Sequence, residues 1–365
     1  MSYTRRRFIT ALGAGSALLA MPAFPFASNN NIKVQNISKK LGVALVGLGN
    51  YSTGQLAPAL QETNNCYLAG IVTGTPGKAA KWKSQYSIPD KSIYNYENFD
   101  SIAENDSIDV VYVVLPNSMH HEFTIRAAKA GKHVFCEKPM GINAEECREM
   151  IDACKKAGVR LFIGYRLHTE PYHMAAMKFR TTGVGELKII EAGFGFNSGD
   201  PNQWRLKKAL SGGGPIMDLG IYCIQAARYS TGEEPVAITA QTYKTDPVKF
   251  SEVNETTTWQ MEFPGGTVAN CFTSYAAPAN RLYLGAERGW FQLQPAFSYN
   301  GLQGWTDQGE LILPDINQQA AQMDKFSACI INNQPSDAGG EEGLKDLIVI
   351  DAVKKAIESG GKVKI

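Results

Sequence analysis

The sequence has no excess of either charge, because 36 Lys and Arg residues are matched by 35 Asp and Glu residues. A balanced composition gives no footprint for nucleic acid or for an anionic membrane surface, so neither is expected as a partner. Repeats of fixed period and low-complexity blocks are absent too, which excludes solenoids and long disordered tracts. What remains is a globular protein, and 365 residues are ordinary for an enzyme of two domains.

Cysteines at metal-binding spacing are also missing. The seven cysteines are an odd number, and no two of them form a Cys-x-x-Cys pair. The sequence therefore predicts neither a zinc site nor a disulfide framework, and no metal is expected. We expect the thiols to be reduced and mostly buried as small apolar side chains.

No hydrophobic run in the sequence is long enough for a stable membrane span, but the N-terminus has the features of an export signal. Arginines at 5–7 precede an apolar run at 11–20 that is rich in glycine and alanine, and small residues follow. This pattern predicts a twin-arginine-type signal peptide at 1–27, an N-terminal arm at 28–40, and a periplasmic or otherwise exported protein. A weak membrane anchor and an uncleaved Sec signal are the alternatives.

Strands and helices alternate in the first half of the chain. Apolar segments with β-branched residues predict strands at 42–46, 67–72, 108–115, 133–136 and 160–163. The segments between them predict helices at 55–62, 77–86, 122–130 and 144–157. Alternation with short connections is typical of a parallel sheet built from right-handed βαβ units. We therefore predict a Rossmann-type domain at 41–163.

The pattern changes after residue 164. Consecutive strands without intervening helices are predicted at 187–196, 236–243, 256–263, 267–275, 281–286 and 289–293, followed by a final helix at 344–359. We therefore predict an α/β protein whose second domain, at 164–365, is α+β with a large, mostly antiparallel open sheet. An open sheet face needs a cover, so a homodimer or homotetramer is expected.

The first predicted strand ends in the glycine turn Gly47-Leu48-Gly49-Asn50-Tyr51-Ser52. In a dinucleotide-binding turn the first glycine allows the tight bend, the second lets the backbone approach the pyrophosphate, and the third position needs a small residue. Ser52 meets that need less well than glycine. The position directly after the first strand favours a dinucleotide site over an ordinary strand-to-helix turn.

The end of the second predicted strand distinguishes NAD from NADP. NAD-binding folds normally present Asp or Glu there, whereas this chain has Thr73, Gly74 and, shortly after, Lys78. A hydroxyl and a lysine can hold a 2′-phosphate through hydrogen bonds and charge. NADP is therefore favoured over NAD. The alternative for Lys78 is a solvated surface residue.

Two further strand ends carry candidate site residues. One is Leu115-Pro116-Asn117 with His120 shortly after it, and the other is Cys136-Glu137-Lys138-Pro139. Ligands bind at the carboxyl edge of open α/β sheets, so both segments should face the cofactor and substrate. A lysine at this edge favours an alkoxide-like state of a reacting hydroxyl. An ordinary capped turn is the alternative for the first segment.

With these residues the sequence resembles a known family. Glu137-Lys138-Pro139, after Gly131-Lys132-His133, resembles the Glu-Lys-Pro signature of the glucose–fructose oxidoreductase and inositol dehydrogenase (Gfo/Idh/MocA) family. Further similar segments lie at 115–118, 163–166, 203–206, 212–214, 217–222, 232–235 and 340–343. Several of them, with the twin-arginine signal, are most similar to the periplasmic glucose–fructose oxidoreductase branch.

The resemblance implies hydride transfer between NADP(H) and a sugar or polyol. It implies Tyr222 as the general acid/base, with Lys138 polarising the substrate oxygen and favouring the ionised tyrosine. Asp218 is implied to bind a neighbouring hydroxyl or to orient the base, and four residues of spacing place it on the helix face of Tyr222. The alternative for Tyr222 is an amphipathic core tyrosine.

The predicted cofactor-binding residues come from two sources: the ends of the predicted strands, and positions that the resemblance to the family implies. Tyr96 is expected near the adenine, or in ordinary packing. Arg166, Trp204 and Arg205 are expected beside the nicotinamide and substrate, or paired with structural carboxylates. The full set is Gly47, Leu48, Gly49, Asn50, Tyr51, Thr73, Gly74, Lys78, Tyr96, Leu115, Pro116, Asn117, His120, Glu137, Lys138, Arg166, Trp204 and Arg205.

Two other functions stay open at this point. Some exported proteins that resemble the family are NAD-dependent glycosidases, but they usually carry a histidine-rich segment where this chain has Gly220-Ile221-Tyr222. A non-catalytic sugar- or nucleotide-binding protein is the second alternative, and the chemistry of Lys138, Asp218 and Tyr222 argues against it. Members of the resembled branch hold their cofactor permanently and cover it with an arm, for which 28–40 looks short.

Overall fold

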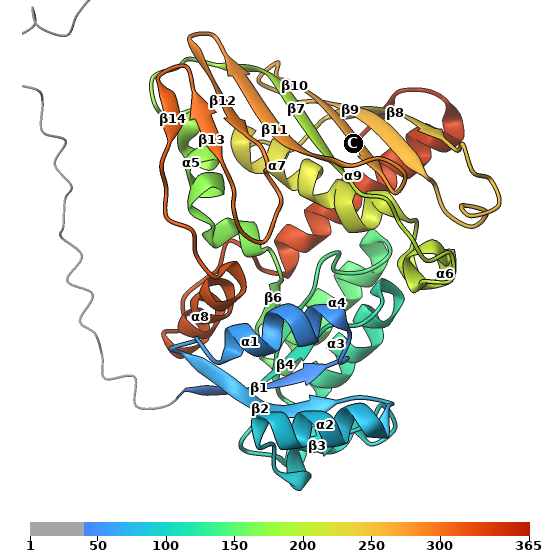
Figure 1. Cartoon of the computed structure of the whole chain (residues 1–365), viewed down its shortest axis with the longest axis vertical. Helices are drawn as coiled ribbons and strands as arrows, with labels where there is room; N and C mark the ends of the chain where they lie inside the picture. Colours follow the sequence, from blue (N-terminus) through green and yellow to red (C-terminus); the bar gives the residue numbers. More distant parts are fainter. Residues whose placement is uncertain (1–39) are drawn as a thin grey trace, which may run out of the picture. The chain divides into compact units, whose positions relative to one another are not determined.

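The computed structural model describes residues 40–365. The predicted signal peptide at 1–27 and the arm at 28–40, except its last residue, lie outside the described residues. The first sheet has six parallel strands in the order β3-β2-β1-β4-β5-β6 (Figure 1). They are β1 (Leu41–Val46), β2 (Cys66–Val72), β3 (Ile93–Tyr94), β4 (Val110–Val113), β5 (His133–Cys136) and β6 (Leu161–Ile163). The order reverses direction between β1 and β4, where ligands bind in doubly wound sheets.

Helices connect these strands, namely α1 (Ala57–Leu60), α2 (Pro76–Tyr86), α3 (His120–Lys129) and α4 (Ala144–Ala157). Helix α4 begins and ends where the sequence predicts. The Asn143 side chain caps its start by accepting from the Glu146 amide, and Gly158 ends it with a φ of +70°. The helix after β1 starts earlier than the predicted 55–62, directly behind the glycine turn, and contains the π-helical segment Ser52–Leu56.

The second sheet has nine strands in the order β14-β13-β12-β11-β7-β10-β9-β8-β15. Only β7 and β10 pair in parallel. The strands are β7 (Leu187–Gly195), β8 (Ala237–Tyr243), β9 (Thr256–Glu262), β10 (Val268–Ser274), β11 (Ala279–Ala286), β12 (Gly289–Leu293), β13 (Gly304–Thr306), β14 (Gly309–Leu311) and β15 (Val363–Lys364). The predicted fold class is therefore confirmed.

The sequence did not predict the short edge strands β3, β13, β14 and β15, since two or three residues carry no readable period. It also left several helices of the second half unassigned. The helices there are α5 (Pro171–Phe179), α6 (Lys208–Ser211), α7 (Ile221–Thr231), α8 (Gln318–Ile331) and α9 (Gly340–Ser359). Helix α9 begins four residues before the predicted 344. Helices α7 and α9 contact one face of the second sheet, through β7 and β8 respectively.

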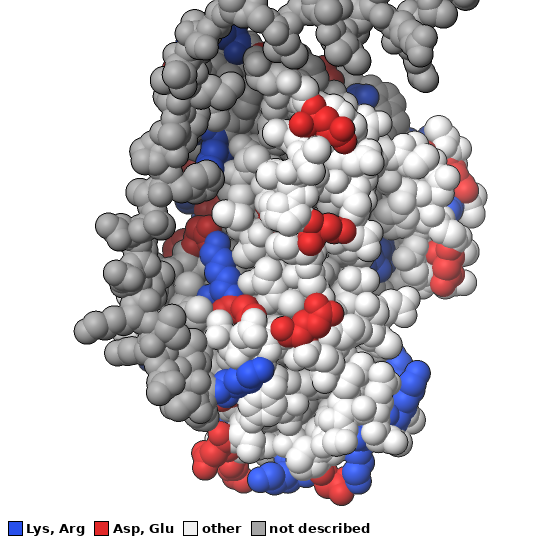
Figure 2. All heavy atoms as spheres, turned by 60° about the vertical axis from the view of Figure 1, so that its left-hand side comes forward, with Lys and Arg blue, Asp and Glu red and all other residues white. Residues whose placement is uncertain are grey.

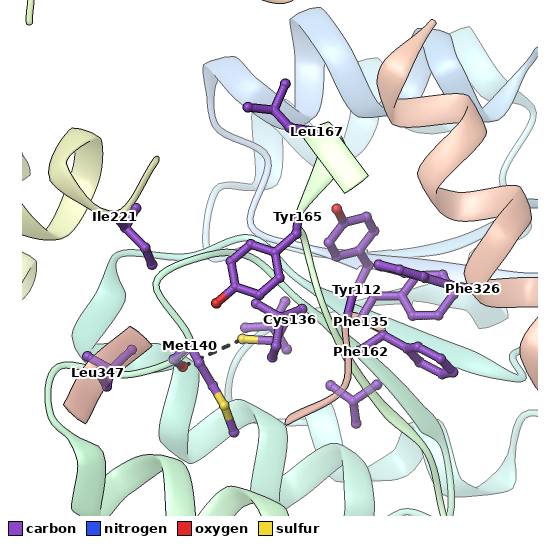
Figure 3. Packing of buried hydrophobic residues seen from close by; sticks show 14 of the residues in the cluster. Tyr112, Phe135, Cys136, Met140, Phe162, Tyr165, Leu167, Ile221, Phe326 and Leu347 are labelled. Carbon is purple, nitrogen blue, oxygen red and sulfur yellow. Dashed lines mark hydrogen bonds between the residues drawn. The ribbon is translucent and has the colours of Figure 1, made fainter. Parts of the chain in front are cut away.

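An aromatic cluster joins the first sheet to helix α8 (Figure 3). Phe326 of α8 stacks on Phe162 of β6 with 5.0 Å between ring centroids, and it meets Phe135 of β5 at 5.3 Å. Tyr112 of β4 extends the cluster by packing edge-on against Phe135 at 5.6 Å. Such pairs stabilise the fold beyond the burial of their area. A helix from the C-terminal region thus belongs to the core of the first sheet.

A buried ionic network holds α7 against α9. Arg228 of α7 is 4% exposed and pairs with Asp346 of α9, with Glu342 at 2.8 Å and with Glu234 at 2.6 Å. The Tyr165 hydroxyl donates to the same Asp346 at 2.6 Å. Burial raises the pKa of Asp346 to about 6, although Arg228 acts in the opposite direction. Removing one partner of a buried pair costs about 3–5 kcal/mol, so this network fixes the helix that carries Tyr222.

The charges on the surface follow the balance of the composition. On the face shown in Figure 2, acidic and basic side chains are interspersed among uncharged residues. Six of the seven cysteines are buried, as the sequence predicts. Within residues 40–365, no helix combines the length and the apolar character needed to cross a bilayer. The same residues contain no cluster of three or more potential metal ligands.

Candidate active site

The turn after β1 has the geometry that an approaching pyrophosphate requires. Gly47 has a φ of +93°, and a Cβ there would lie 2.4 Å from the Val114 carbonyl oxygen, so only glycine fits. A Cβ on Gly49 would meet nothing within 4 Å, which leaves open space beside its backbone. The buried Ser52 donates its hydroxyl to the Gly47 carbonyl oxygen at 2.5 Å. The serine therefore closes the turn, and the helix starting at Asn50 presents its first N–H groups to the open side.

The structure brings together the four residues predicted around the 2′-phosphate and adenine. Thr73 is buried at the end of β2, and its hydroxyl oxygen accepts from the Thr75 amide at 3.2 Å. The Tyr96 ring covers Gly74, because a Cβ on that glycine would lie 3.1 Å from the ring. Lys78 is exposed in the first turn of α2. The segment 73–78 contains no carboxylate, so nothing in it repels a phosphate.

Two residues predicted to bind the cofactor, His120 and Asn117, form hydrogen bonds to backbone carbonyl oxygens around the site. His120 is 1% exposed, and its ring nitrogens contact the carbonyl oxygens of Leu115 at 2.9 Å and Pro139 at 2.8 Å. The Asn117 side-chain amide donates to the Ser211 carbonyl oxygen at 2.8 Å. These contacts tie the segment after β4 to the segment after β5 and to the second domain. Both residues position the strand ends, and contact with the cofactor stays a prediction.

Lys138 and Asp218 meet where β5 faces the π-helical segment Ile216–Gly220. The Lys138 Nζ donates to the Asp218 carbonyl oxygen at 2.8 Å and lies 3.5 Å from Asp218 Oδ1. Arg205 Nε donates to Oδ2 at 2.8 Å, and the Tyr275 hydroxyl donates to the same oxygen at 3.0 Å. Burial opposes the charge of Asp218, but Arg205 and Lys138 outweigh it and hold the pKa of this carboxyl below its usual value.

Tyr222 follows directly, in the first turn of α7. The Lys138 Nζ lies over its ring, 4.6 Å from the centroid, so Asp218 and Tyr222 share Lys138 as a neighbour. The phenol oxygen accepts a hydrogen bond from Arg166 Nε at 3.3 Å. The side chains of Asp218 and Tyr222 therefore lie on the same side of the chain, as predicted. The turn between them is π-helical and not regular α-helix.

The remaining predicted residues lie around Lys138, Asp218 and Tyr222. The Arg205 guanidinium lies over the Trp204 ring at 4.7 Å and bonds Asp218 Oδ2, whereas Lys138 lies near Oδ1. Glu137 is buried and accepts from the Tyr112 hydroxyl at 2.6 Å. Burial raises the pKa of Glu137, against the lowering effect of Tyr112 and of Lys138. A small cavity beside these groups is lined by Lys138, Tyr165, Arg166, Leu167, Ile221, Tyr222 and Gln225, three of which Figure 3 labels.

Sequence reasoning missed three residues of this site. Tyr275 follows β10 and bonds Asp218, Tyr299 follows β12 and stacks on Tyr51 with 5.9 Å between ring centroids, and Gln318 begins α8. None of them stands in a recognisable motif, and each reaches the site through packing of the second domain. Only the position of Tyr275 at a strand end gave a signal that reasoning from sequence could have used.

Two family models match the chain. The model described as an oxidoreductase family with an NAD-binding Rossmann fold matches residues 41–165. The model described as the GFO/IDH/MocA C-terminal domain matches residues 176–292. Together they cover most of the chain, including the first sheet and the strands β7 to β11 of the second sheet.

Similar proteins include enzymes that act on sugars. The D-xylose 1-dehydrogenase [NADP(+)] of Haloarcula marismortui is 31% identical over 340 residues, which are 88% of this chain and 92% of that protein. The D-glucoside 3-dehydrogenase of Escherichia coli is 27% identical over 90% of this chain and 98% of that protein. The solved aldose-aldose oxidoreductase from Caulobacter crescentus, complexed with glycerol, is 44% identical with a TM-score of 0.87, over 90% of this chain and all of that one.

Proposed function

This chain belongs to the Gfo/Idh/MocA oxidoreductase family, and from that premise we propose that it transfers a hydride between NADP(H) and a CH–OH group of a sugar or polyol. The observation that carries the proposal is the meeting of Lys138, Asp218 and Tyr222 at the carboxyl edge of the first sheet. A lysine, an ionised carboxylate and a phenol are the groups needed to orient a polyol and to move its hydroxyl proton.

The residues present fit NADP. Gly47 allows the tight bend, Gly49 leaves space for the pyrophosphate, and Thr73 with Lys78 offers a hydroxyl and a charge to the 2′-phosphate. When bound, NADP supplies the carbon that accepts or returns the hydride. Binding, orientation and proton transfer are left to the protein.

The side chains divide the proton chemistry between them. The departing hydride carries both electrons of the oxidation, so only the hydroxyl proton is left for the protein; the deprotonated Tyr222 oxygen takes it, and the alcohol becomes a carbonyl. Lys138 stabilises the negative charge that develops on the substrate oxygen. Asp218, kept ionised by Arg205 and Lys138, accepts a hydrogen bond from a neighbouring hydroxyl. In the reverse direction the same Tyr222 oxygen returns the proton.

The nucleotide itself provides the first test. Mass spectrometry of the small molecules released when the purified protein is denatured should detect NADP(H) if the cofactor is held tightly. A Lys78→Ala variant should bind NADP about 10-fold more weakly, because it loses the cation beside the 2′-phosphate, and should bind NAD unchanged. Isothermal titration with both nucleotides measures the difference. Equal weakening for NAD would contradict the assignment of Lys78.

We propose further that a second sugar can take the hydride back while the nucleotide stays bound. The name of the similar aldose-aldose oxidoreductase, which has an aldose on both sides of the reaction, supports a sugar as the acceptor. Glucose added to the purified protein should then change the absorbance of the bound nicotinamide in one turnover, and a second aldose should reverse the change. Release of nitrophenol from chromogenic glycosides would instead support the glycosidase alternative.

The open face of the second sheet supports an oligomer. A cavity of about 650 Å³ lies on this face, lined among others by Glu191, Phe272 and Arg281. Beside it the half-exposed rings of Tyr283 and Trp290 stack with 6.3 Å between centroids. Opposite charges next to exposed rings suit an isologous contact, so we propose that a second copy of this chain covers the face.

Light scattering tests this proposal. The wild-type protein should have at least twice the mass of one chain, and a Tyr283→Asp/Trp290→Asp variant should shift towards the monomer, because it places two unpaired charges in the contact. A monomeric wild-type protein at micromolar concentration would contradict it.

Export remains a proposal that rests on the sequence at 1–27. We propose transport of the folded protein by the twin-arginine route, which lets the nucleotide bind in the cytoplasm first. Replacing Arg5 and Arg6 with Lys should keep the protein out of the periplasmic fraction. Periplasmic protein in normal amount from that variant would favour the Sec alternative.

A further inference from the structure

Arg166 is a buried cation whose partners are almost all neutral. It follows β6 and is 2% exposed. Its Nη1 donates to the Ser298 carbonyl oxygen at 3.0 Å and to the Gln318 amide oxygen, and its Nη2 donates to the Phe297 carbonyl oxygen at 2.6 Å. Its Nε donates to Tyr222. Among the described residues, no carboxylate forms an ion pair with it.

Burying a cation is unfavourable when no ion pair compensates for the water that the charge loses. Of the four acceptors around Arg166, two are backbone carbonyls and one is an amide. Only the Tyr222 oxygen can itself become an anion. The guanidinium also lies over the Tyr222 ring at 5.1 Å and over the Tyr299 ring at 4.6 Å, so aromatic contacts add to its hydrogen bonds.

Lys138 contacts the ring of Tyr222 and not its oxygen. Its Nζ lies over the Tyr222 ring and donates a hydrogen bond to the Asp218 carbonyl oxygen at 2.8 Å. No hydrogen bond from Lys138 to the phenol oxygen occurs among the described residues, whereas Arg166 makes one at 3.3 Å. From the sequence, Arg166 was expected beside the nicotinamide and substrate, and Lys138 was expected to favour the ionised form of Tyr222. In the structure, Arg166 and not Lys138 hydrogen-bonds the Tyr222 oxygen.

We propose that Arg166 is the positioning residue for Tyr222: it turns the O–H of the phenol towards the substrate and stabilises the negative charge left on the oxygen once that proton is transferred, an inference that rests on the proposed function of Tyr222. A donor on the phenol oxygen leaves the hydroxyl proton free to point away from Arg166. A fixed cation then favours the state in which that proton has been given up. Lys138 is left to act on the substrate oxygen.

Gln318 holds Arg166 in this orientation. It stands at the start of α8, accepts from Arg166 and donates to the Ser298 carbonyl oxygen at 3.2 Å. Because α8 packs into the core of the first sheet, the orientation of Arg166 is tied to the strand ends that carry Lys138. Other titratable groups that interact electrostatically with Arg166 or Tyr222 are Tyr51, Tyr299, Glu137, Glu170, His173 and Lys138.

The test follows the ionisation of Tyr222 without any substrate. Phenolate absorbance is titrated in the holoenzyme and in Tyr222→Phe, and the difference gives the Tyr222-dependent step. The same pair is measured in the Arg166→Met background, where the step should move up by about one pH unit or more, equivalent to a tenfold change in proton affinity. Arg166→Lys should restore part of the shift, because it keeps the charge but not the planar fork. Gln318→Met should shift the step less, in the same direction.

Kinetics provide the second readout. The acidic limb of kcat/KM against pH should move with the absorbance step in Arg166→Met, with KM for NADP unchanged. Lys354→Met, which removes a partly buried cation that does not contact Tyr222, should move neither. If Arg166→Met does not fold, Arg166→Lys and Gln318→Met still report a shift. An unmoved absorbance step in an enzyme that oxidises aldoses overturns the role of Arg166 alone. A shifted step in a protein that oxidises no sugar overturns the proposed function alone.

Discussion

A Tyr222→Phe variant should lose about 10²- to 10⁴-fold in kcat while keeping its nucleotide, because only the oxygen that moves the proton is removed. The ring packs against Phe194 at 5.4 Å and Phe297 at 5.8 Å between centroids, and phenylalanine preserves both contacts. Steady-state kinetics with an aldose, together with the nucleotide content of the purified variant, measure the two quantities separately.

Tyr229 offers a matched control on the same helix. Its hydroxyl bonds His173 and reaches none of Lys138, Asp218 and Arg166 among the described contacts. Tyr229→Phe removes the same atom from the same kind of residue and should leave kcat near the wild-type value. If Tyr222→Phe also turned over normally, the proton would have to move through another group, and the proposed role of Tyr222 would be rejected.

A Lys138→Met variant should lower kcat by about 10³-fold, the loss expected when one preorganised cation or donor is withdrawn from a developing oxyanion. The variant also removes one of the two cations that keep Asp218 ionised, so the pKa of Asp218 should rise towards its usual value. The first loss should not depend on pH, whereas the second should appear at low pH, where Asp218 would then take up a proton. Measuring kcat from acidic to neutral pH separates the constant loss from the pH-dependent one.

Lys354 is the control for this substitution. Its Nζ donates to the Ile142 carbonyl oxygen at 3.0 Å and lies 3.6 Å from Asp351, so it is a partly buried lysine with a similar set of partners. Lys354→Met should retain the wild-type kcat. A Lys138→Met enzyme with normal kcat and raised KM would show that Lys138 only binds the sugar, against its assigned role in the reaction.

Local patterns explain why much of the fold was predictable. The bounds of β5, α4 and β12 agree with the sequence prediction, because apolar periodicity and end signals such as Asn143 and Gly158 act within a few residues. Edge strands of two or three residues and the helices α5 and α8 were not assigned. Their sequences carry weaker local signals, and their conformation depends on the surfaces against which they pack.

The sequence by itself determined the class of protein and the kind of cofactor. A glycine turn after an apolar strand, the lack of an acid at 73–78 and the lysine after β5 are local features whose chemistry does not depend on distant residues. Tertiary structure alone decided which groups meet at the phenol oxygen. Arg166 and Gln318 are 152 residues apart, and Tyr275 reaches Asp218 across 57 residues. Such pairs form only when distant segments of the second domain pack against one another, and no spacing in the chain encodes that contact.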